Sequence, residues 1–283
     1  RDLSRSFYFQ KQGGIVVSHP EDKNEVFNLK RKLKQHNLEY VYEEIPKTKL
    51  DSFEPDLSFN FKEALYFPNE GHVDPLSFHK AFVEKIIPQC TGIHFETEVL
   101  NIKPYKIETT KGHHSFDYVI DCRGLEAKKD LDSLRGVRGE VIKVQAQGIK
   151  ISRPVRLMHP RYQIYVVPRP MNSYLIGATT IESEDFSPVS VRSALELLSA
   201  FYSLNSSFSE ARILEMNVQC RPAFTNNNPK IIFNKEGGLI RVNGLYRHGY
   251  LTSPKLAEIL LNRMNDTSGS NSSFSECCFW EDL

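Results

Sequence analysis

The stretch "NGLYRHGYLTSP", residues 243–254, combines groups that could bind a planar or anionic ligand. Gly244 and Gly249 lack a Cβ atom, which lets a backbone turn sharply and come close to a ligand. Apolar segments precede and follow the stretch, so we expect a strand, a turn and a helix that Ser253 caps and Pro254 begins. A helix N-terminus carries about half a positive charge and unpaired amide donors. An ordinary strand–loop–helix connection would contain similar residues, so this stretch alone leaves both interpretations open.

Three arginines could hold a substrate carboxylate, because the guanidinium group binds it with a planar fork that lysine does not have. Arg247 lies inside the turn. Arg169 and Arg221 each precede a proline at the end of an expected strand, where each either closes a ligand cavity or pairs with a carboxylate of the protein. Tyr165, in "YQIYVVPRP", is expected on a strand, either as a ligand contact or as a half-buried side chain.

The composition indicates a globular protein with a small partner. The chain has 283 residues, 40% hydrophobic and 25% charged, enough for one large domain or two interleaved ones. Its 36 lysines and arginines balance 35 acidic residues, so no long-range field would attract nucleic acid or an anionic membrane. No apolar run approaches the roughly 18 residues of a membrane span, and residues 1–10 lack the features of a secretory signal. We therefore expect a cytoplasmic protein.

The five cysteines predict neither a disulfide nor a metal site. Cys90, Cys122 and Cys220 are isolated in apolar or strand-like surroundings, where a buried thiol behaves as a small hydrophobic group. Cys277 and Cys278 are adjacent in a polar segment, and no Cys/His spacing typical of zinc occurs. We expect no metal.

The elements that position these residues change in type near Gly136. Before it, residues 21–37 have apolar side chains at helical spacing, the two prolines of residues 43–57 favour a loop, and Asp74–Pro75 predicts a helix start. After it, β-rich segments separated by Gly, Pro and Asn turns predict an antiparallel sheet, interrupted by one helix over residues 188–204.

Six segments, in order, resemble one family of enzymes. They are "ALYFPNEGHVDP", "VIDCRG", "LRGVRGEV", "YVVPRP" with "LIGATT", "CRPAF" and "NGLYRHGYLTSP". Together they are similar to the D-amino-acid oxidase and glycine oxidase group of FAD-dependent oxidoreductases, most closely to the glycine oxidase of thiamine biosynthesis. The resemblance covers about residues 7 to 263 and is more specific than any single segment.

The resemblance implies an α/β FAD-binding domain of the GR2 Rossmann-like type, interleaved with a substrate domain on an antiparallel sheet. The family begins with a strand, a GxGxxG turn and a helix, and this motif does not occur in the sequence. We expect the chain to be part of a complete flavoenzyme, because a sheet without its central strand would expose unpaired backbone groups. The alternative is a short relative without cofactor that acts as an interaction module. The expected parts are residues 1–20 (substrate-domain strands), 21–67 (helix and loop region), 68–135 (FAD-binding domain), 136–235 (substrate domain), 236–264 (FAD-binding domain) and 265–283 (flexible tail).

The resemblance also implies roles for individual residues. Arg247 would hold the substrate carboxylate, and Tyr165 would make a second substrate or lid contact. The backbone of Val99 would meet the adenine part of FAD. The other implied FAD-binding residues are Gly124, Gly244, Tyr246, His248, Gly249, Tyr250 and Leu251.

The implied reaction is the FAD-dependent oxidation of a small, glycine-like amino acid to an imino acid, with release of hydrogen peroxide. The product would feed thiazole formation if the thiamine role holds. Expected partners are the amino acid and oxygen, and a homo-oligomer is left open. A flavin dehydrogenase of the same fold, passing electrons to another acceptor, is a second interpretation.

Overall fold

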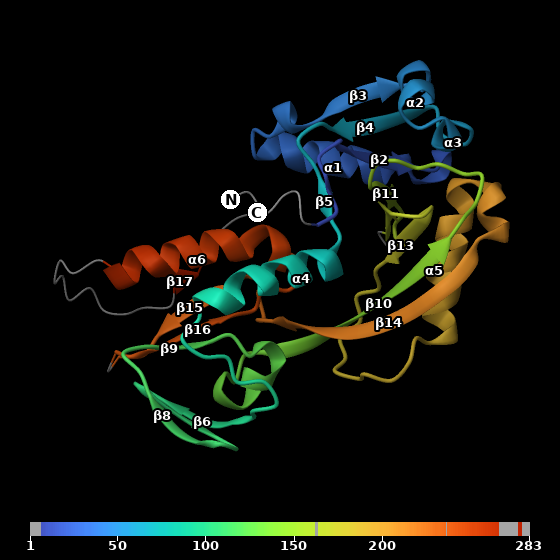
Figure 1. Cartoon of the computed structure of the whole chain (residues 1–283). Helices are drawn as coiled ribbons and strands as arrows, with labels where there is room; N and C mark the ends of the chain where they lie inside the picture. Colours follow the sequence, from blue (N-terminus) through green and yellow to red (C-terminus); the bar gives the residue numbers. More distant parts are fainter. Residues whose placement is uncertain (1–6, 162–163, 236, 266–276, 279–283) are drawn as a thin grey trace. The chain divides into compact units, whose positions relative to one another are not determined.

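The computed structural model describes residues 7–161, 164–235, 237–265 and 277–278 (Figure 1). The chain folds into two compact units, each assembled from separate segments. The two units are interleaved along the sequence, as predicted, while the assignment of each part to FAD or substrate stays a prediction. Unit 1 contains the described parts of residues 1–91, 139–180 and 187–218, and unit 2 those of residues 92–138, 181–186 and 219–283.

An eight-stranded sheet is the frame of unit 1, in the order β14-β10-β13-β12-β11-β2-β4-β3. From β10 to β3 the neighbouring strands are antiparallel, except for the parallel pair β11–β2. Alternate side chains such as Ile142, Val166 and Ile176 form the main hydrophobic core on one face. The strands are β2 (Gly14–Ser18), β3 (Glu43–Pro46), β4 (Glu63–Phe67), β10 (Arg135–Gln145), β11 (Val155–Met158), β12 (Ile164–Arg169), β13 (Ser173–Gly177) and β14 (Arg212–Ala223).

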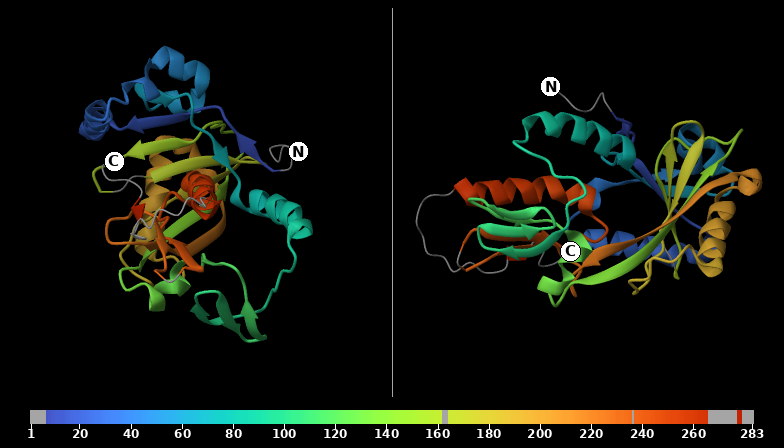
Figure 2. Two further views of the ribbon diagram at one scale, coloured as in Figure 1. Left: turned by 90° about the vertical axis from the view of Figure 1, so that its left-hand side faces the viewer. Right: turned by 60° about the horizontal axis from the view of Figure 1, so that its bottom comes forward.

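Helices cover both faces of this sheet. Helix α5 (Val191–Leu204) lies against this sheet (Figure 2). Its Leu197 and Phe201 side chains belong to the main core. It begins three residues after the predicted start, because the Ser190 side chain accepts a hydrogen bond from the backbone N–H of Ser193 and caps the helix there. Helix α1 (Lys23–Gln35) packs on a second cluster around Val16.

The start of α4 (Pro75–Ile86) confirms the predicted cap, since Asp74 Oδ2 accepts a 2.9 Å hydrogen bond from the backbone N–H of Ser77. Just before it, β5 (His72–Val73) pairs with β1 (Phe9–Gln10).

The predicted loop over residues 43–57 was wrong. This segment forms β3, α2 (Lys47–Phe53) and the start of α3 (Pro55–Ser58). Pro46 ends a strand at the edge of the sheet, and Pro55 is the first residue of α3. At both positions the missing N–H of proline costs little, so the prolines mark element ends and do not prevent regular structure.

Unit 2 contains a four-stranded sheet in the order β17-β15-β16-β9 and a three-stranded sheet in the order β6-β7-β8. Helix α6 (Gly249–Asn265) lies along β15 and β16 (Figure 1). Its Leu256 and Leu260 side chains form a hydrophobic cluster with Ile231 and Ile240. The strands are β6 (Val99–Lys103), β7 (Lys106–Thr109), β8 (Gly112–Ser115), β9 (Val119–Asp121), β15 (Lys230–Phe233), β16 (Leu239–Asn243) and β17 (Cys277–Cys278).

The remaining elements are short 3-10 turns at Pro20–Asp22, Glu39–Val41, Ile87–Gln89, Gly124–Asp130 and Ser206–Glu210. Within the predicted flexible tail, Cys277 and Cys278 pair with β15, and the rest beyond Asn265 lies outside the described residues.

Cys90 and Cys122 are exposed, which corrects the expectation of buried thiols. None of the helices in the described ranges is long and apolar enough to cross a membrane. Nor do the described side chains include a group of three or more His, Cys, Asp and Glu suited to a metal ion.

Candidate functional site

Two parallel strands of unit 2, β9 and β16, end side by side. Leu239 lies opposite Val119, and Arg241 lies opposite Asp121. Each strand leads into a glycine-containing turn followed by helical structure. The carboxyl ends of neighbouring parallel strands are where open α/β sheets present groups to ligands.

The turn after β16 gets its shape from internal packing. Gly244 has φ of +77°, and a Cβ atom there would lie 2.2 Å from Cδ2 of the buried Phe224 ring. Tyr246 also has positive φ, +48°, and its backbone N–H donates to the Pro222 carbonyl at 3.1 Å. The structure therefore explains Gly244 by its conformation and by Phe224, without a ligand.

Helix α6 begins at Gly249, which corrects the predicted start at Ser253–Pro254. The His248 carbonyl accepts hydrogen bonds from the backbone N–H groups of Leu251 (3.0 Å) and Thr252 (2.9 Å), so the first helical turn forms before the proline. Pro254 lies inside the helix. The helix N-terminus thus lies in the aromatic turn itself, one turn earlier than the cap residues suggested.

Gly249 is the first residue of α6 and has no positive φ, so the backbone there does not need the sharp turn expected from a glycine. A Cβ atom at this position would meet only Leu245 Cβ, at 3.9 Å. Gly124, after β9, has φ of +60°, and its Cβ would meet only Pro222 Cγ, at 3.8 Å. Both glycines therefore leave room beside the backbone, in contrast to Gly244.

Buried charges fix the turn after β9. The Asp121 side chain is fully buried, and Arg123 Nε and Nη2 donate to its two oxygens at 2.9 and 2.8 Å. Arg241 Nε lies 3.5 Å from Asp121 Oδ2. Burial alone would raise the pKa of Asp121, but the hydrogen bonds from Arg123 and the charges of Arg123 and Arg241 outweigh it and lower the pKa.

The predicted residues of the α6 turn present a cation and aromatic groups. Arg247 is exposed, and no carboxylate among the described residues forms an ion pair with it. Partial burial, and then the charge of Arg247, lower the pKa of His248 below its usual range. Tyr250 and Leu251, at the start of α6, are exposed.

In unit 1, Tyr165 and Arg169 lie on the face of β12 opposite the main core and are half-buried. Arg169 is already paired: Nη1 donates to His72 Nδ1 at 3.1 Å, and Nε lies 3.5 Å from Asp74 Oδ1. Burial, and then the Arg169 charge, lower the pKa of His72 to about 4. The structure thus favours the ion-pair interpretation of Arg169.

The structure brings some predicted residues together and separates others. Gly124 and the α6 turn are joined through Asn243, whose Nδ2 donates to the Gly124 carbonyl at 2.8 Å. Val99 begins β6 in the other sheet of unit 2. Sequence reasoning missed Asn243, although an amide side chain directly after an apolar strand is a signal for a side-chain-to-backbone turn.

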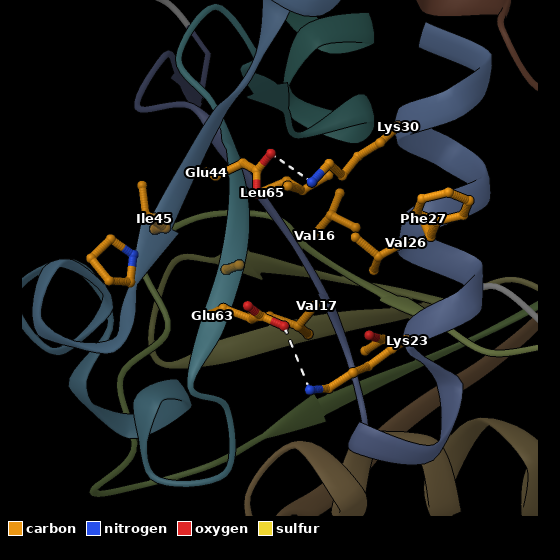
Figure 3. A pocket seen from close by; sticks show the side chains of 13 residues that line it. Val16, Val17, Lys23, Val26, Phe27, Lys30, Glu44, Ile45, Glu63 and Leu65 are labelled. Carbon is orange, nitrogen blue, oxygen red and sulfur yellow. Dashed lines mark ion pairs between the residues drawn. The ribbon is translucent and has the colours of Figure 1, made fainter. Parts of the chain in front are cut away.

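A cavity of about 420 Å³ in unit 1 contains none of the predicted site residues (Figure 3). Its walls are α1 and the strands β2, β3 and β4, with apolar side chains such as Val16, Ile45 and Leu65. Two ion pairs cross it, Lys30–Glu44 at 2.6 Å and Lys23–Glu63 at 3.9 Å.

Curated relatives of the chain are oxidoreductases by name. A Rhizobium etli protein, named as a thiamine biosynthesis oxidoreductase, ThiO, is 36% identical over 266 residues, which cover 93% of this chain and 74% of that protein. Glycine oxidase of Geobacillus kaustophilus is 26% identical over 200 residues, covering 68% of this chain and 53% of that protein.

Solved structures agree on the fold. The crystal structure of glycine oxidase from Geobacillus kaustophilus superposes with a TM-score of 0.82 at 22% identity, covering 99% of this chain and 79% of that one. L-proline dehydrogenase from P. horikoshii gives a TM-score of 0.79 at 18% identity, covering 92% of this chain and 73% of that one. The predicted fold class, α/β structure interleaved with an antiparallel sheet, is confirmed.

The sequence profile of the DAO family, described as FAD dependent oxidoreductase, matches residues 1–263. This match spans both units, including β9, β16, the α6 turn and the β12 face. With the parallel-strand site and the glycine-oxidase fold, it establishes that the chain belongs to the DAO family of FAD-dependent oxidoreductases.

Proposed function

We propose that this flavoprotein oxidises a small α-amino acid, glycine or one similar to it, to an imino acid and transfers the electrons to oxygen. The observation that carries the proposal is the position of Arg247. It is an exposed guanidinium without an ion-pair partner among the described residues, two residues before the positive N-terminus of α6. A substrate carboxylate would neutralise it.

The contrast with Arg169 supports this choice. Arg169 is held by Asp74 and His72, so a substrate carboxylate there would have to compete with an existing partner. Arg247 has no such competitor, and its planar fork can bind both carboxylate oxygens.

The residues of unit 2 fit FAD. Gly124 and Gly249 leave space beside the backbone where a planar group could lie close, and the α6 N-terminus favours negative charge. Bound FAD would supply hydride acceptance and reaction with oxygen. We propose that Gly124 and the backbone of residues 244–251 hold it, with Val99 near the adenine part.

Tyr165 is proposed as a second substrate contact. Its hydroxyl can donate to or accept from the substrate and so help to orient the Cα–H bond. We assign no side-chain base, because an amine that arrives unprotonated needs none.

The relationship to ThiO supports a role in thiamine biosynthesis, where the imino acid would be used in thiazole formation. We further propose a cytoplasmic location, with the amino acid and oxygen as partners.

The test is substitution of Arg247 in the full-length, flavin-loaded enzyme. Removing one partner of a charge-assisted pair costs roughly 2–4 kcal/mol, so Arg247→Ala should lower kcat/KM for glycine about 30- to 1000-fold. The kcat/KM of Arg247→Lys for glycine should lie between those of the parent and Arg247→Ala, because lysine keeps the positive charge but lacks the planar fork. Methylamine, which lacks the carboxylate, should show a much smaller loss.

Arg263→Ala, an exposed arginine near the end of α6, is the matched control and should behave as the parent. Equal losses for glycine and methylamine, at normal flavin content, would place the carboxylate elsewhere, with Arg221 next to be tested. Faster reoxidation by a quinone dye than by oxygen would support the dehydrogenase alternative.

A further inference from the structure

Tyr165 and Gly177 face each other across β12 and β13. A Cβ atom on Gly177 would lie 2.5 Å from Tyr165 Oη, 2.6 Å from Cζ and 2.8 Å from Cε2. Carbon atoms in proteins do not approach this closely without a shift. The phenol ring therefore occupies space that only a glycine at position 177 leaves.

Two other tyrosines in the described residues lie over glycines, but for a different reason. Tyr66 covers Gly13 and Tyr105 covers Gly238, and these glycines have φ of +81° and +69°. The left-handed backbone requires glycine at both, whatever the ring does. Gly177 has no positive φ and pairs in register with Val141 on its other side. Of the three, Gly177 alone has a ring as its main steric constraint.

The ring is not part of the main core. Ile164 and Val166, its neighbours on β12, are buried among the core side chains, while Tyr165 is half-buried on the opposite face. Moving the ring would therefore leave the core packing in place. What would change is the position of the hydroxyl.

We propose that Gly177 is a positioning residue that sets the height of the Tyr165 hydroxyl above the sheet. The inference rests on the proposed function, in which Tyr165 contacts the substrate. A methyl group at position 177 would push the contact from 2.5 Å toward the 3.4–4 Å of ordinary van der Waals contact, a shift of about 1 Å at the ring. A misplacement of about 1 Å can cost about 100-fold in rate.

The experiment is a double-mutant cycle on the full-length flavoenzyme with Gly177→Ala, Tyr165→Phe and the double variant. Gly177→Ala should lower kcat/KM for glycine about 10- to 100-fold with flavin content unchanged. In the Tyr165→Phe background the same substitution should change kcat/KM by less than about twofold, because the hydroxyl it displaces is gone. Additive losses, or no loss in the single variant, would overturn the proposal.

Gly14→Ala is the matched control. Gly14 also lies in a strand of this sheet without positive φ, but its Cβ would meet the carboxylate of Glu70, which pairs with Arg156 and can move without touching Tyr165, so kcat/KM should stay near that of the parent. If Gly177→Ala does not fold, adding Tyr165→Leu should restore folding, since the ring is the main obstacle. Failure of this rescue would contradict the inference.

A readout without turnover separates this inference from the proposed function. In protein labelled with 3-fluorotyrosine, the ¹⁹F resonance of Tyr165, assigned by its loss in Tyr165→Phe, should shift in Gly177→Ala and not in Gly14→Ala. An unshifted resonance would mean that Gly177 does not set the ring position. If the resonance shifts but the parent enzyme does not oxidise glycine, Gly177 does position Tyr165, and the proposed function is wrong.

Discussion

Asn243 Nδ2 donates a 2.8 Å hydrogen bond to the carbonyl oxygen of Gly124, and Asn243 Oδ1 accepts one of 2.8 Å from the backbone N–H of Gly244. Only 2% of Asn243 is exposed. One amide side chain thus ties together the turns that follow β9 and β16, the two segments to which we assign FAD contacts.

Asn243→Ala should lower the free energy of unfolding by about 2–4 kcal/mol, because it leaves the partly buried Gly124 carbonyl and the buried Gly244 N–H without this partner. Urea denaturation measures this loss. Asn217→Ala, which removes an exposed amide bonded to Glu215, should cost less than about 0.5 kcal/mol. Equal effects of the two variants would mean that the link between the turns is not important for stability.

Gly244→Ala and Gly249→Ala should separate folding from cofactor binding. At Gly244 the positive φ and the contact with Phe224 predict a loss of at least about 1–3 kcal/mol in stability. At Gly249 alanine suits the helical backbone and should be neutral or stabilising by up to about 1 kcal/mol. If FAD lies beside Gly249, that variant should nonetheless retain less flavin, as measured by absorbance at about 450 nm. Full flavin retention in Gly249→Ala would argue against this contact.

His72 should make stability depend on pH between about 6.5 and 4. Its pKa is lowered to about 4 by burial and by the Arg169 charge, whereas an unfolded histidine titrates near 6.5. As the pH falls through this range, the unfolded chain takes up a proton that the folded chain does not, so stability falls by up to about 3 kcal/mol. Urea denaturation measures the free energy of unfolding at pH 7 and at pH 4.5. The decrease between the two pH values should be smaller in His72→Gln than in the parent by about 2–3 kcal/mol. Parallel pH profiles would contradict this assignment.

Asp121→Asn should destabilise the protein by about 3–5 kcal/mol at pH 7, because Arg123 and Arg241 lose the buried charge between them. The pKa of Asp121 is lowered in the folded state, so its contribution is present above the pKa of the unfolded chain and is lost as the pH falls below about 4. Thermal unfolding at pH 7 and pH 3 should therefore show a larger gap between parent and variant at pH 7. Asp51→Asn, in an exposed pair with Lys47, is the control and should change little. A gap that does not depend on pH would contradict the ionised state of Asp121.

Local signals in the sequence were sufficient for much of the fold. Asp74 followed by Pro75 predicted the start of α4, because an N-cap acceptor and a preset φ act within one helical turn. The β-rich segment around Tyr165 and the apolar segment before residue 243, each bounded by turn residues, predicted β12 and β16. The start of α6 was predicted wrongly. Ser253 and Pro254 are a strong local signal for a helix start, but the His248 carbonyl already accepts hydrogen bonds from Leu251 and Thr252, so the helix begins one turn before them. The two prolines of residues 43–57 likewise predicted a loop, although they lie at the ends of a strand and a helix.

The sequence by itself determined the family, the strand–turn–helix order around Arg247 and the residue types available to bind a carboxylate. Only the tertiary structure decided which of these groups already pair with other side chains of the protein. Arg169 meets Asp74 across 95 residues of chain, and Asn243 meets Gly124 across 119. The steric role of Gly177 exists only because β12 and β13 pair in one register. Such contacts depend on which distant segments fold against each other, and no linear pattern carries that information.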